Sequence, residues 1–370
     1  MMVGILGGGQ LGRMLVLAGY PLGLKFRVLD PSPDAPAREL ADHVIGSYED
    51  PNALERFARN LHVVTYEFEN VPVSSVKLLA RQIPVYPPPD ALEVSQDRFV
   101  EKTFLQDVGV PTPEFARVES HEDLHAAIGR LGLPGMLKTQ RLGYDGKGQF
   151  LLKAAGDAEA AWKALQGMPL IFEKFVAFER EVSILAMRNR DEKTGFYPLV
   201  ENRHDAGILR CTFAPAADLT PGLQSQAETY AVRVLEALRY VGVLAIEFFQ
   251  VGDRLIANEI APRVHNSGHW TIEGAETSQF ENHLRAVSGL PLGLSSAIGC
   301  SAMLNIIGQL PEPENILSVP GAHLHTYGKS PRAGRKLGHV TVHAPDRDSM
   351  ETRYAQLHER LFGEKPGTAH

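Results

Sequence analysis

The chain has 370 residues, enough for two or three domains with buried cores at roughly 150 residues per domain. Hydrophobic residues make up 44% and charged residues 22%, as in globular enzymes, and a formal net charge of -7 disfavours a chain built mainly to hold nucleic acid. The two cysteines, Cys211 and Cys300, are too few and too far apart for a disulfide framework or a zinc site.

The first residues lack the basic start and the long apolar stretch of a signal peptide. No run in the sequence approaches the ~18 apolar residues that a membrane-spanning helix needs. We therefore expect a cytoplasmic enzyme with no membrane partner and no nucleic-acid partner. A local basic patch can still bind a small phosphorylated ligand.

Residues 1–95 alternate short apolar runs with amphipathic stretches, which predicts an amino-terminal domain. The runs at 3–6, 26–29 and 63–66 indicate strands, and those at 11–18 and 54–59 indicate helices. Strand–helix alternation at this spacing predicts a parallel sheet covered by helices, as in Rossmann-like domains. Three consecutive prolines at 87–89 end the block.

A glycine-rich loop joins the first predicted strand to the first predicted helix. Gly7, Gly9 and Gly12 fit the pattern G-x-G-x-x-G, in which the backbone approaches an anion beside a helix amino terminus. Asp30 ends the second strand, where a dinucleotide-binding fold places the acid that binds a ribose. Three interpretations stay open: a dinucleotide site, a phosphate site or a tight turn.

The next block mixes helices with hairpins, and we expect it to form a second domain at 96–295. Strands are predicted at 151–153, 170–173, 181–187, 243–249 and 255–260, and helices at 230–238 and 280–287. A small carboxyl-terminal domain at 296–370 is partly β, with strands at 322–327 and 337–343 around a basic turn.

A loop rich in glycine and lysine lies between two strand-like runs of the second block. Gly143, Gly146 and Gly148 fall within six positions, with Lys138 and Lys147 beside them. A loop of this composition is mobile and has many free backbone N–H groups, so it can close over a polyphosphate and neutralise its charge. The alternative is an exposed β-turn with solvated lysines.

The strand predicted at 170–173 ends in a carboxylate, Glu173, and Glu181 follows a few residues later. Backbone groups beside such a strand end can bind the edge of an adenine, and Glu181 can accept hydrogen bonds from ribose hydroxyls. An ordinary strand with surface charges is the alternative.

Two carboxylates stand inside apolar strands, Glu247 in the run 245–249 and Glu259 in the run 255–260. Burying such charges is costly unless they are paired or bind a metal ion. A three-residue hairpin loop would place Glu247 opposite Glu259 on one face, whereas a two-residue turn would put Asn258 there and turn Glu259 away. Two carboxylates and an amide suit Mg²⁺, and two glutamates facing water are the alternative.

Four stretches together resemble the ATP-grasp superfamily, and most closely its 5-(carboxyamino)imidazole ribonucleotide synthase family, the biotin-independent carboxylases of purine biosynthesis. They occur in the expected order over nearly the whole chain, at 9–14, 143–149, 258–271 and 327–338. The third, Asn-Glu-Ile-Ala-Pro-Arg-Val-His-Asn-Ser-Gly-His-Trp-Thr, is long enough to be specific. The resemblance implies an α/β protein with an ATP-grasp domain whose mobile lid covers about 100–170, and a homodimer.

The resemblance also implies ATP and Mg²⁺ as cofactors, with two metal ions expected, and no biotin. Glu247 and Glu259 are the implied metal ligands. ATP binding is implied for Arg98, Lys138, Gly143, Tyr144, Asp145, Gly146, Lys147, Gly148, Glu173, Lys174, Phe175, Val176, Glu181, His204, Asn258 and Glu259. Two positions depart from the family pattern: Leu142 replaces a glycine of many relatives, and Lys147 replaces an arginine of some.

The implied reaction uses ATP to phosphorylate bicarbonate, and the exocyclic amine of aminoimidazole ribonucleotide attacks the CO₂ that carboxyphosphate releases. Arg263 suits an anion because of its donor fork. Asp145 or His265 orients or deprotonates the amine, and the sequence does not choose between them. Further substrate contacts are expected from Gly9, Gln10, Leu11, Glu69, Asn70, Tyr144 and Asn266 and, for the ribose phosphate, from the basic turn with Lys329, Arg332, Arg335 and Lys336.

Other functions remain as alternatives. A formate-dependent glycinamide ribonucleotide transformylase would share the ATP and Mg²⁺ residues, and a biotin carboxylase would need a longer chain. An NAD-dependent oxidoreductase would use the first glycine loop but leaves the paired acids of the second block unexplained. A nucleotide sensor would bind ATP without turnover.

Overall fold

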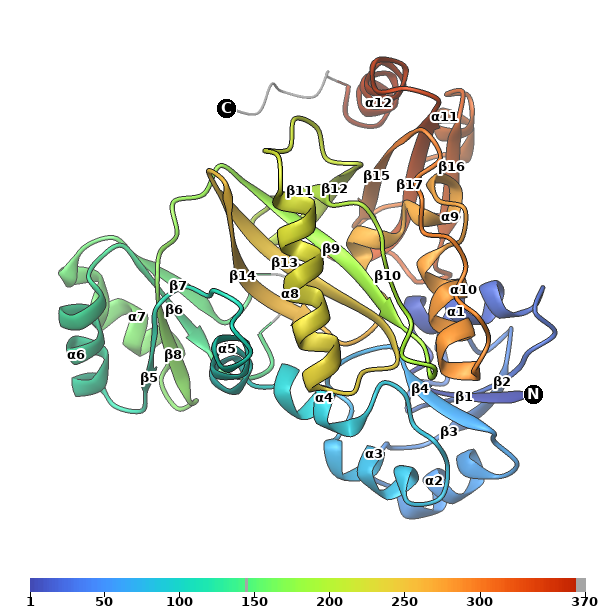
Figure 1. Ribbon diagram of the computed structural model, residues 1–370, viewed down its shortest axis with the longest axis horizontal. Coiled ribbons are helices and arrows are strands. Elements are labelled where there is room, and N and C mark those ends of the chain that lie inside the picture. The colour runs from blue at the N-terminus through green and yellow to red at the C-terminus, as the bar shows by residue number, and fades with distance from the viewer. Residues whose placement is uncertain (144–145, 364–370) are drawn as a thin grey trace.

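The computed structural model describes residues 1–143 and 146–363. Its amino-terminal part is a four-stranded parallel sheet in the order β3-β2-β1-β4 (Figure 1). The strands are β1 (Met2–Leu6), β2 (Lys25–Asp30), β3 (Asp42–Ile45) and β4 (Val63–Tyr66), and the helices are α1 (Gln10–Gly19), α2 (Pro51–Ala58) and α3 (Val73–Ala80). The three strands and two helices predicted here are confirmed. The edge strand β3 was not predicted, because its half-exposed sequence Asp-His-Val-Ile lacks an apolar run.

Two short helices follow the first sheet, α4 (Pro89–Ser95) and α5 (Arg98–Asp107). Pro89 is the first residue of α4, a position that suits proline because no intrahelical hydrogen bond needs its N–H. The start of α5 is fixed by Asp97, whose carboxylate accepts the backbone N–H groups of Phe99 and Val100 at 3.1 and 3.3 Å.

A separate antiparallel sheet, in the order β5-β8-β6-β7, projects from one side of the molecule (Figure 1). It consists of β5 (Phe115–Val118), β6 (Gly135–Thr139), β7 (Gln149–Leu152) and β8 (Leu170–Lys174), with α6 (His121–Leu131), η1 (Ala155–Asp157) and α7 (Ala158–Leu165). We call this unit the lid sheet. Since β6 and β7 pair directly, the glycine- and lysine-rich loop is the connection of a hairpin, as predicted.

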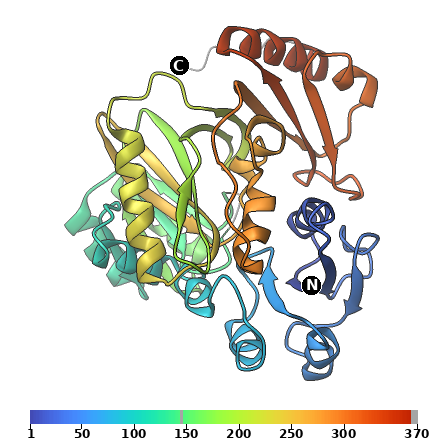
Figure 2. The same cartoon turned by 45° about the vertical axis from the view of Figure 1, so that its right-hand side comes forward.

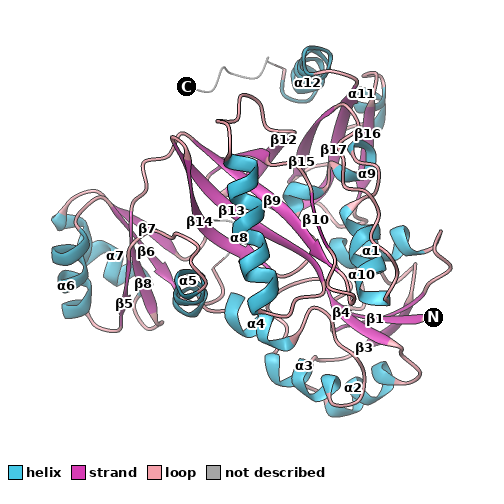
Figure 3. Cartoon of the chain, viewed as in Figure 1, coloured by secondary structure: helices cyan, strands magenta, loops and turns pink. Residues whose placement is uncertain are grey.

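The largest sheet has nine strands and runs in the order β14-β13-β9-β11-β12-β15-β17-β16, with β10 paired to β9. Its strands are β9 (Arg180–Arg188), β10 (Thr194–Phe196), β11 (Val200–Asp205), β12 (Ile208–Ala214), β13 (Gly242–Val251), β14 (Arg254–Ala261), β15 (Cys300–Ile307), β16 (Ala322–Thr326) and β17 (Lys336–Ala344). The sheet is continuous across residue 295, because β12 pairs with β15. Figure 3 shows this run of strands from the middle of the molecule to its carboxyl-terminal end.

The helices of this part are α8 (Leu223–Ala237), η2 (Asn266–Gly268), α9 (Thr271–Gly274), α10 (Gln279–Ser288), α11 (Pro313–Leu317) and α12 (Arg347–Phe362). The α8 helix begins seven residues before the predicted 230, since its first turns are mostly polar and bury only small or isolated apolar side chains. In Figure 2 the carboxyl-terminal strands of the large sheet and α12 stand above the first sheet.

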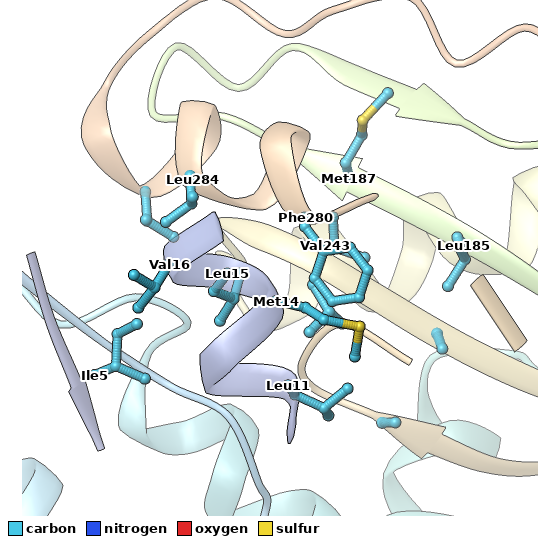
Figure 4. Packing of buried hydrophobic residues seen from close by; sticks show 14 of the residues in the cluster. Ile5, Leu11, Met14, Leu15, Val16, Leu185, Met187, Val243, Phe280 and Leu284 are labelled. Atoms are coloured by element: carbon cyan, nitrogen blue, oxygen red, sulfur yellow. The ribbon is translucent and has the colours of Figure 1, made fainter. Parts of the chain in front are cut away.

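A shared hydrophobic core joins the first sheet to the large one. Leu11, Met14 and Leu15 of α1 pack towards Phe280 and Leu284 of α10 (Figure 4). This contact fixes the carboxyl ends of β1 and β4 against the large sheet. Over the described ranges, no helix combines the length and the apolar composition required to cross a membrane.

Candidate active site

A cavity of about 590 Å³ lies where the first sheet, the lid sheet and the large sheet meet. The volume is within the range of small-molecule sites. The first sheet contributes residues that follow the carboxyl ends of β1 and β4, where the strand order reverses and open parallel sheets bind ligands. Residues predicted for the site that line it are Gln10, Leu11, Glu69, Asn70, Arg98, Lys138, Gly143, Gly146, Lys147, Glu173, Lys174, Phe175, Val176, Glu181, His204, Glu247, Asn258, Glu259, Arg263, His265, Asn266 and Lys336.

The two carboxylates predicted to pair do lie opposite each other, Glu247 on β13 and Glu259 on β14. The hairpin loop nevertheless has two residues, Gly252 and Asp253, so the premise of a three-residue loop was wrong. A β-bulge between Glu247 and Phe248 corrects the register: Phe248 pairs with Ala257, and Asn258 is the extra residue. A two-residue turn alone would direct Glu259 to the opposite face of the sheet from Glu247. The bulge therefore returns Glu259 to the same face as Glu247.

Burial and the proximity of Glu259 raise the pKa of Glu247 to about 7. Burial also acts to raise the pKa of Glu259, but Arg98, whose Nη1 lies 3.0 Å from Glu259 Oε2, more than offsets it and lowers that pKa. The buried Oδ1 atom of Asn258 has no hydrogen-bond partner. Two carboxylates and an open amide oxygen fit Mg²⁺.

The described residues form no cluster of three or more His, Cys, Asp or Glu side chains able to hold a metal ion by themselves. A cation at Glu247 and Glu259 must therefore complete its shell with other oxygens, as Mg²⁺ does with waters and substrate phosphates.

Three cations surround the buried carboxylate of Glu173. Lys138 Nζ lies 2.9 Å and Lys102 Nζ 3.5 Å from Glu173 Oε2. Burial alone would raise the pKa of Glu173, but Lys102, Lys138 and Arg98 lower it to about 2. Because Lys138 also lines the cavity, this wall presents positive charge to an anionic ligand.

Another part of the cavity lining contains an ion pair and two stacked rings. His204 Nδ1 lies 2.5 Å from Glu181 Oε2. Burial opposes the charge on His204, but the hydrogen bond to Glu181 and the nearby Glu247 raise its pKa above the usual value. Phe178 and Phe249 are stacked at 4.7 Å between ring centroids, and both line the cavity, so they offer an apolar surface beside the charged one.

Arg263 and His265 stand between the large sheet and the first. Arg263 Nε donates to Glu69 Oε2, and the cation lowers the pKa of Glu69 despite the burial of that carboxyl. His265 caps η2: the backbone N–H of Ser267 donates to its Nδ1 at 3.3 Å. Burial, together with Arg263 and Lys336, lowers the pKa of His265 to about 3, so its imidazole is neutral.

The backbone N–H groups of the amino-terminal glycine loop are already bonded to carboxyl side chains of the same chain. Gly9 and Gly12 donate their backbone N–H groups to Glu67 at 2.6 and 2.8 Å, and Gly8 donates to Asp30 at 2.8 Å. A Cβ atom at Gly9 would lie 2.4 Å from the Glu67 carboxylate, which explains the glycine. This geometry favours the tight-turn interpretation and disfavours a dinucleotide, whose phosphates would need the same N–H groups.

The basic turn between β16 and β17 reaches the same region. Lys329 Nζ donates to Gln10 Oε1, and burial lowers the pKa of Lys329 to about 8. Lys336 lines the cavity, whereas Arg332 is exposed and Arg335 donates to the carbonyl of Ser330 at 3.2 Å.

Some predicted site residues do not line the cavity, namely Gly9, Gly148, Lys329, Arg332 and Arg335. Tyr144 and Asp145 lie outside the described residues. Beside them Leu142 is 66% exposed with a φ of 62°, a conformation that glycine adopts freely and leucine rarely.

The cavity is also lined by residues that were not predicted for the site. They are Glu67, Phe68, Pro113, Met136, Gln149, Phe178, Gly207, Leu209, Phe249 and His269. Three of them had a signal in the sequence: Glu67 follows the third apolar strand, as Glu69 does, and Gln149 and His269 lie within the stretches 143–149 and 258–271. Most of the others are apolar or stand in loops.

Three domain families match the chain. The ribonucleotide synthetase preATP-grasp domain matches residues 1–96, the ATP-grasp domain 103–280, and the phosphoribosylaminoimidazole carboxylase C-terminal domain 301–353. N5-carboxyaminoimidazole ribonucleotide synthase of Pseudomonas aeruginosa is 52% identical over 357 residues, covering 96% of this chain and 98% of the relative. The enzyme of that name from Brucella melitensis is 48% identical over 345 residues, covering 92% and 95%.

Solved structures agree. N5-carboxyaminoimidazole ribonucleotide synthetase from Thermus thermophilus matches with a TM-score of 0.94 and 58% identity, covering 99% of both chains. The synthase from Aspergillus clavatus in complex with ADP and 5-aminoimidazole ribonucleotide matches with a TM-score of 0.91 and 34% identity, covering 97% of this chain and 98% of that one.

Proposed function

Because the chain belongs to the N5-carboxyaminoimidazole ribonucleotide synthase family of ATP-grasp ligases, and so carboxylates 5-aminoimidazole ribonucleotide with ATP in purine biosynthesis, we propose how its cavity performs that reaction. The observation that carries the proposal is the convergence of a carboxylate pair, a lysine-lined wall and an arginine on one cavity. These groups suit a nucleotide triphosphate, its metal ion and a second anion.

ATP lies between the lid sheet and the large sheet in this proposal. Lys174 ends β8, and Phe175 and Val176 follow it. With the stacked Phe178 and Phe249, which also line the cavity, they provide backbone groups and an apolar slot for the adenine. Glu181 accepts from the ribose hydroxyls, and Lys138 with residues 143–148 meets the phosphates.

Glu247 and Glu259, with the open Oδ1 of Asn258, are the proposed ligands of Mg²⁺. The ion supplies charge neutralisation on the transferring phosphoryl group when it is bound. The ion pair with Arg98, 3.0 Å between Nη1 and Glu259 Oε2, keeps Glu259 ionised and fixes the position of its carboxylate. An ionised carboxylate is the form that binds a cation.

Bicarbonate is the proposed carboxyl source. Its oxygen attacks the γ-phosphorus, ADP leaves, and carboxyphosphate then divides into CO₂ and phosphate. The exocyclic amine of the ribonucleotide forms a bond to the CO₂ carbon and loses a proton. Arg263, Glu69 and Asn70 hold the imidazole side of this nucleotide, and Lys336 with the basic turn holds its phosphate.

His265 acts as a hydrogen-bond donor in this scheme and not as the base. Its Nδ1 accepts the N–H of Ser267, and a backbone N–H can only donate, so Nδ1 carries a lone pair. The neutral ring therefore has its proton on Nε2, which lies 3.5 Å from Glu247 Oε1. The amine proton then leaves to another acceptor, Asp145 or the released phosphate.

Nitrogen NMR of histidine-labelled protein tests this assignment. We expect the His265 signals, identified by their loss in His265→Gln, to report a protonated Nε2 and an unprotonated Nδ1 at pH 7. A proton on Nδ1 would reject the donor role and restore His265 as a base.

ATP hydrolysis by the purified protein with Mg²⁺ tests the substrates. We expect ADP release to need both bicarbonate and 5-aminoimidazole ribonucleotide, and isotope from labelled bicarbonate to appear in the nucleotide product. Equal turnover after removal of bicarbonate and CO₂ would refute bicarbonate as the carboxyl source. Turnover with formate and glycinamide ribonucleotide instead would refute the assignment of the substrate.

A homodimer and a cytoplasmic location complete the proposal, on the strength of the family resemblance. Light scattering at micromolar concentration gives the mass in solution, and a monomer would contradict the first of these.

A further inference from the structure

Three side chains on one face of α5 form hydrogen bonds with three consecutive residues of β14. Arg98, Glu101 and Lys102 are spaced i, i+3 and i+4, which places them on the same side of a helix. Their partners are residues 258–260, the segment that contains the extra residue of the bulge. Neither Glu101 nor Lys102 was predicted to contribute to the site.

Each contact is direct. Lys102 Nζ donates to the backbone carbonyl of Asn258 at 2.9 Å, and the backbone N–H of Ile260 donates to Glu101 Oε1 at 2.8 Å. Both side chains are almost completely buried, with exposed fractions of 0% for Lys102 and 2% for Glu101. Between these two contacts, Arg98 holds the carboxylate of Glu259 itself.

These partners bind backbone groups at the edge of the sheet. Because β14 is the edge strand of the large sheet, the backbone groups on its outer side have no neighbouring strand to bond with. A buried N–H or C=O group without a partner costs about 1–3 kcal/mol. Glu101 and Lys102 supply an acceptor and a donor to the backbone on either side of Glu259.

We propose that Glu101 and Lys102 are positioning residues for metal binding, because they hold the bulge that places Glu259 opposite Glu247. Without the bulge, the two-residue turn pairs Glu247 with Asn258 and directs Glu259 to the other face of the sheet. The carboxylate pair then no longer exists. This inference rests on the proposed role of Glu247 and Glu259 as metal ligands.

Binding of Mn²⁺, followed by electron paramagnetic resonance in the presence of a non-hydrolysable ATP analogue, tests the inference. We expect Lys102→Met and Glu101→Met to weaken Mn²⁺ binding about 10- to 100-fold, the range seen when supporting groups of a metal site are removed. Glu101→Gln keeps an oxygen acceptor of the same size for Ile260, so Mn²⁺ binding should stay within about 3-fold of the wild type. Lys77→Met, which removes an exposed lysine that does not line the cavity, controls for loss of charge.

Each variant is first checked for its circular dichroism spectrum and its melting temperature. If Lys102→Met does not fold, Lys102→Gln replaces it, since the amide keeps a donor but is too short to reach Asn258 fully. Folded variants with unchanged Mn²⁺ binding would overturn the positioning role. Glu259→Gln distinguishes failure of the metal assignment from failure of the positioning role. If this variant also binds Mn²⁺ like the wild type, Glu259 is not a metal ligand, and the assignment fails together with the positioning role.

Discussion

Glu259→Gln should lower ATP turnover about 100- to 1000-fold while the protein stays folded. Loss of a metal ligand removes several kcal/mol of charge stabilisation on the transferring phosphoryl group, and each 1.36 kcal/mol is a tenfold change in rate. The glutamine side chain has the same size and can still accept from Arg98, 3.0 Å away in the wild type. It cannot provide the negative charge that faces Glu247.

The measurement is the rate of ADP release at saturating ATP, bicarbonate and 5-aminoimidazole ribonucleotide, repeated over a range of Mg²⁺ concentrations. Glu236→Gln, a change of the same kind at an exposed position of α8, should retain wild-type turnover. A Glu259→Gln enzyme within threefold of the wild type at low Mg²⁺ would remove Glu259 from the metal site.

Glu173→Gln should reduce the free energy of unfolding at pH 7 by about 3–5 kcal/mol, the usual cost of breaking a buried ion pair by removing one partner. Glu173 is 2% exposed and lies within ion-pair distance of both Lys138 and Lys102. The neutral amide would leave these two ammonium groups buried together, with Arg98 nearby.

The pH dependence gives this prediction a second readout. The pKa of Glu173 is about 2 in the folded protein and 4.5 for the free group, so its ionisation stabilises the fold above pH 4.5. The stabilisation falls by about 1.4 kcal/mol per pH unit below 4.5 and is lost as the pH passes 2. Urea unfolding at pH 7 and at pH 3.5 should therefore give a smaller difference between wild type and Glu173→Gln at the lower pH. An equal difference at both would contradict the ion-pair explanation.

Local sequence patterns predicted those parts of the fold that depend on neighbouring residues. The apolar runs of β1 and β4 are almost fully buried, so they stand out, whereas β3 at the sheet edge does not. The glycine and lysine pattern at 138–149 correctly indicated a hairpin loop, because the composition of a loop also depends on neighbouring residues. Turn composition near Gly252 was less informative, because loops of two and three residues both fit it.

Features made by distant residues could not be predicted in this way. The glycine loop matched a dinucleotide-binding pattern, but its N–H groups are bound by Glu67, more than fifty positions along the chain. Glu101 and Lys102 resemble the solvated charges of any helix until β14, more than 150 residues later, comes beside them. The pairing of Glu247 with Glu259 was predicted from the wrong loop length and is correct only because of the bulge.

The pairing of β12 with β15 has a consequence for how the chain can be divided. A fragment ending near residue 295 would lack β15, and β12 would become an edge strand with unpaired backbone groups and with Cys211 and Phe213 uncovered. Exposed edges of this kind recruit other strands and promote aggregation. The carboxyl-terminal segment is therefore no detachable module: its strands complete the sheet on which the carboxylate pair stands, and shortened versions of the protein should retain it.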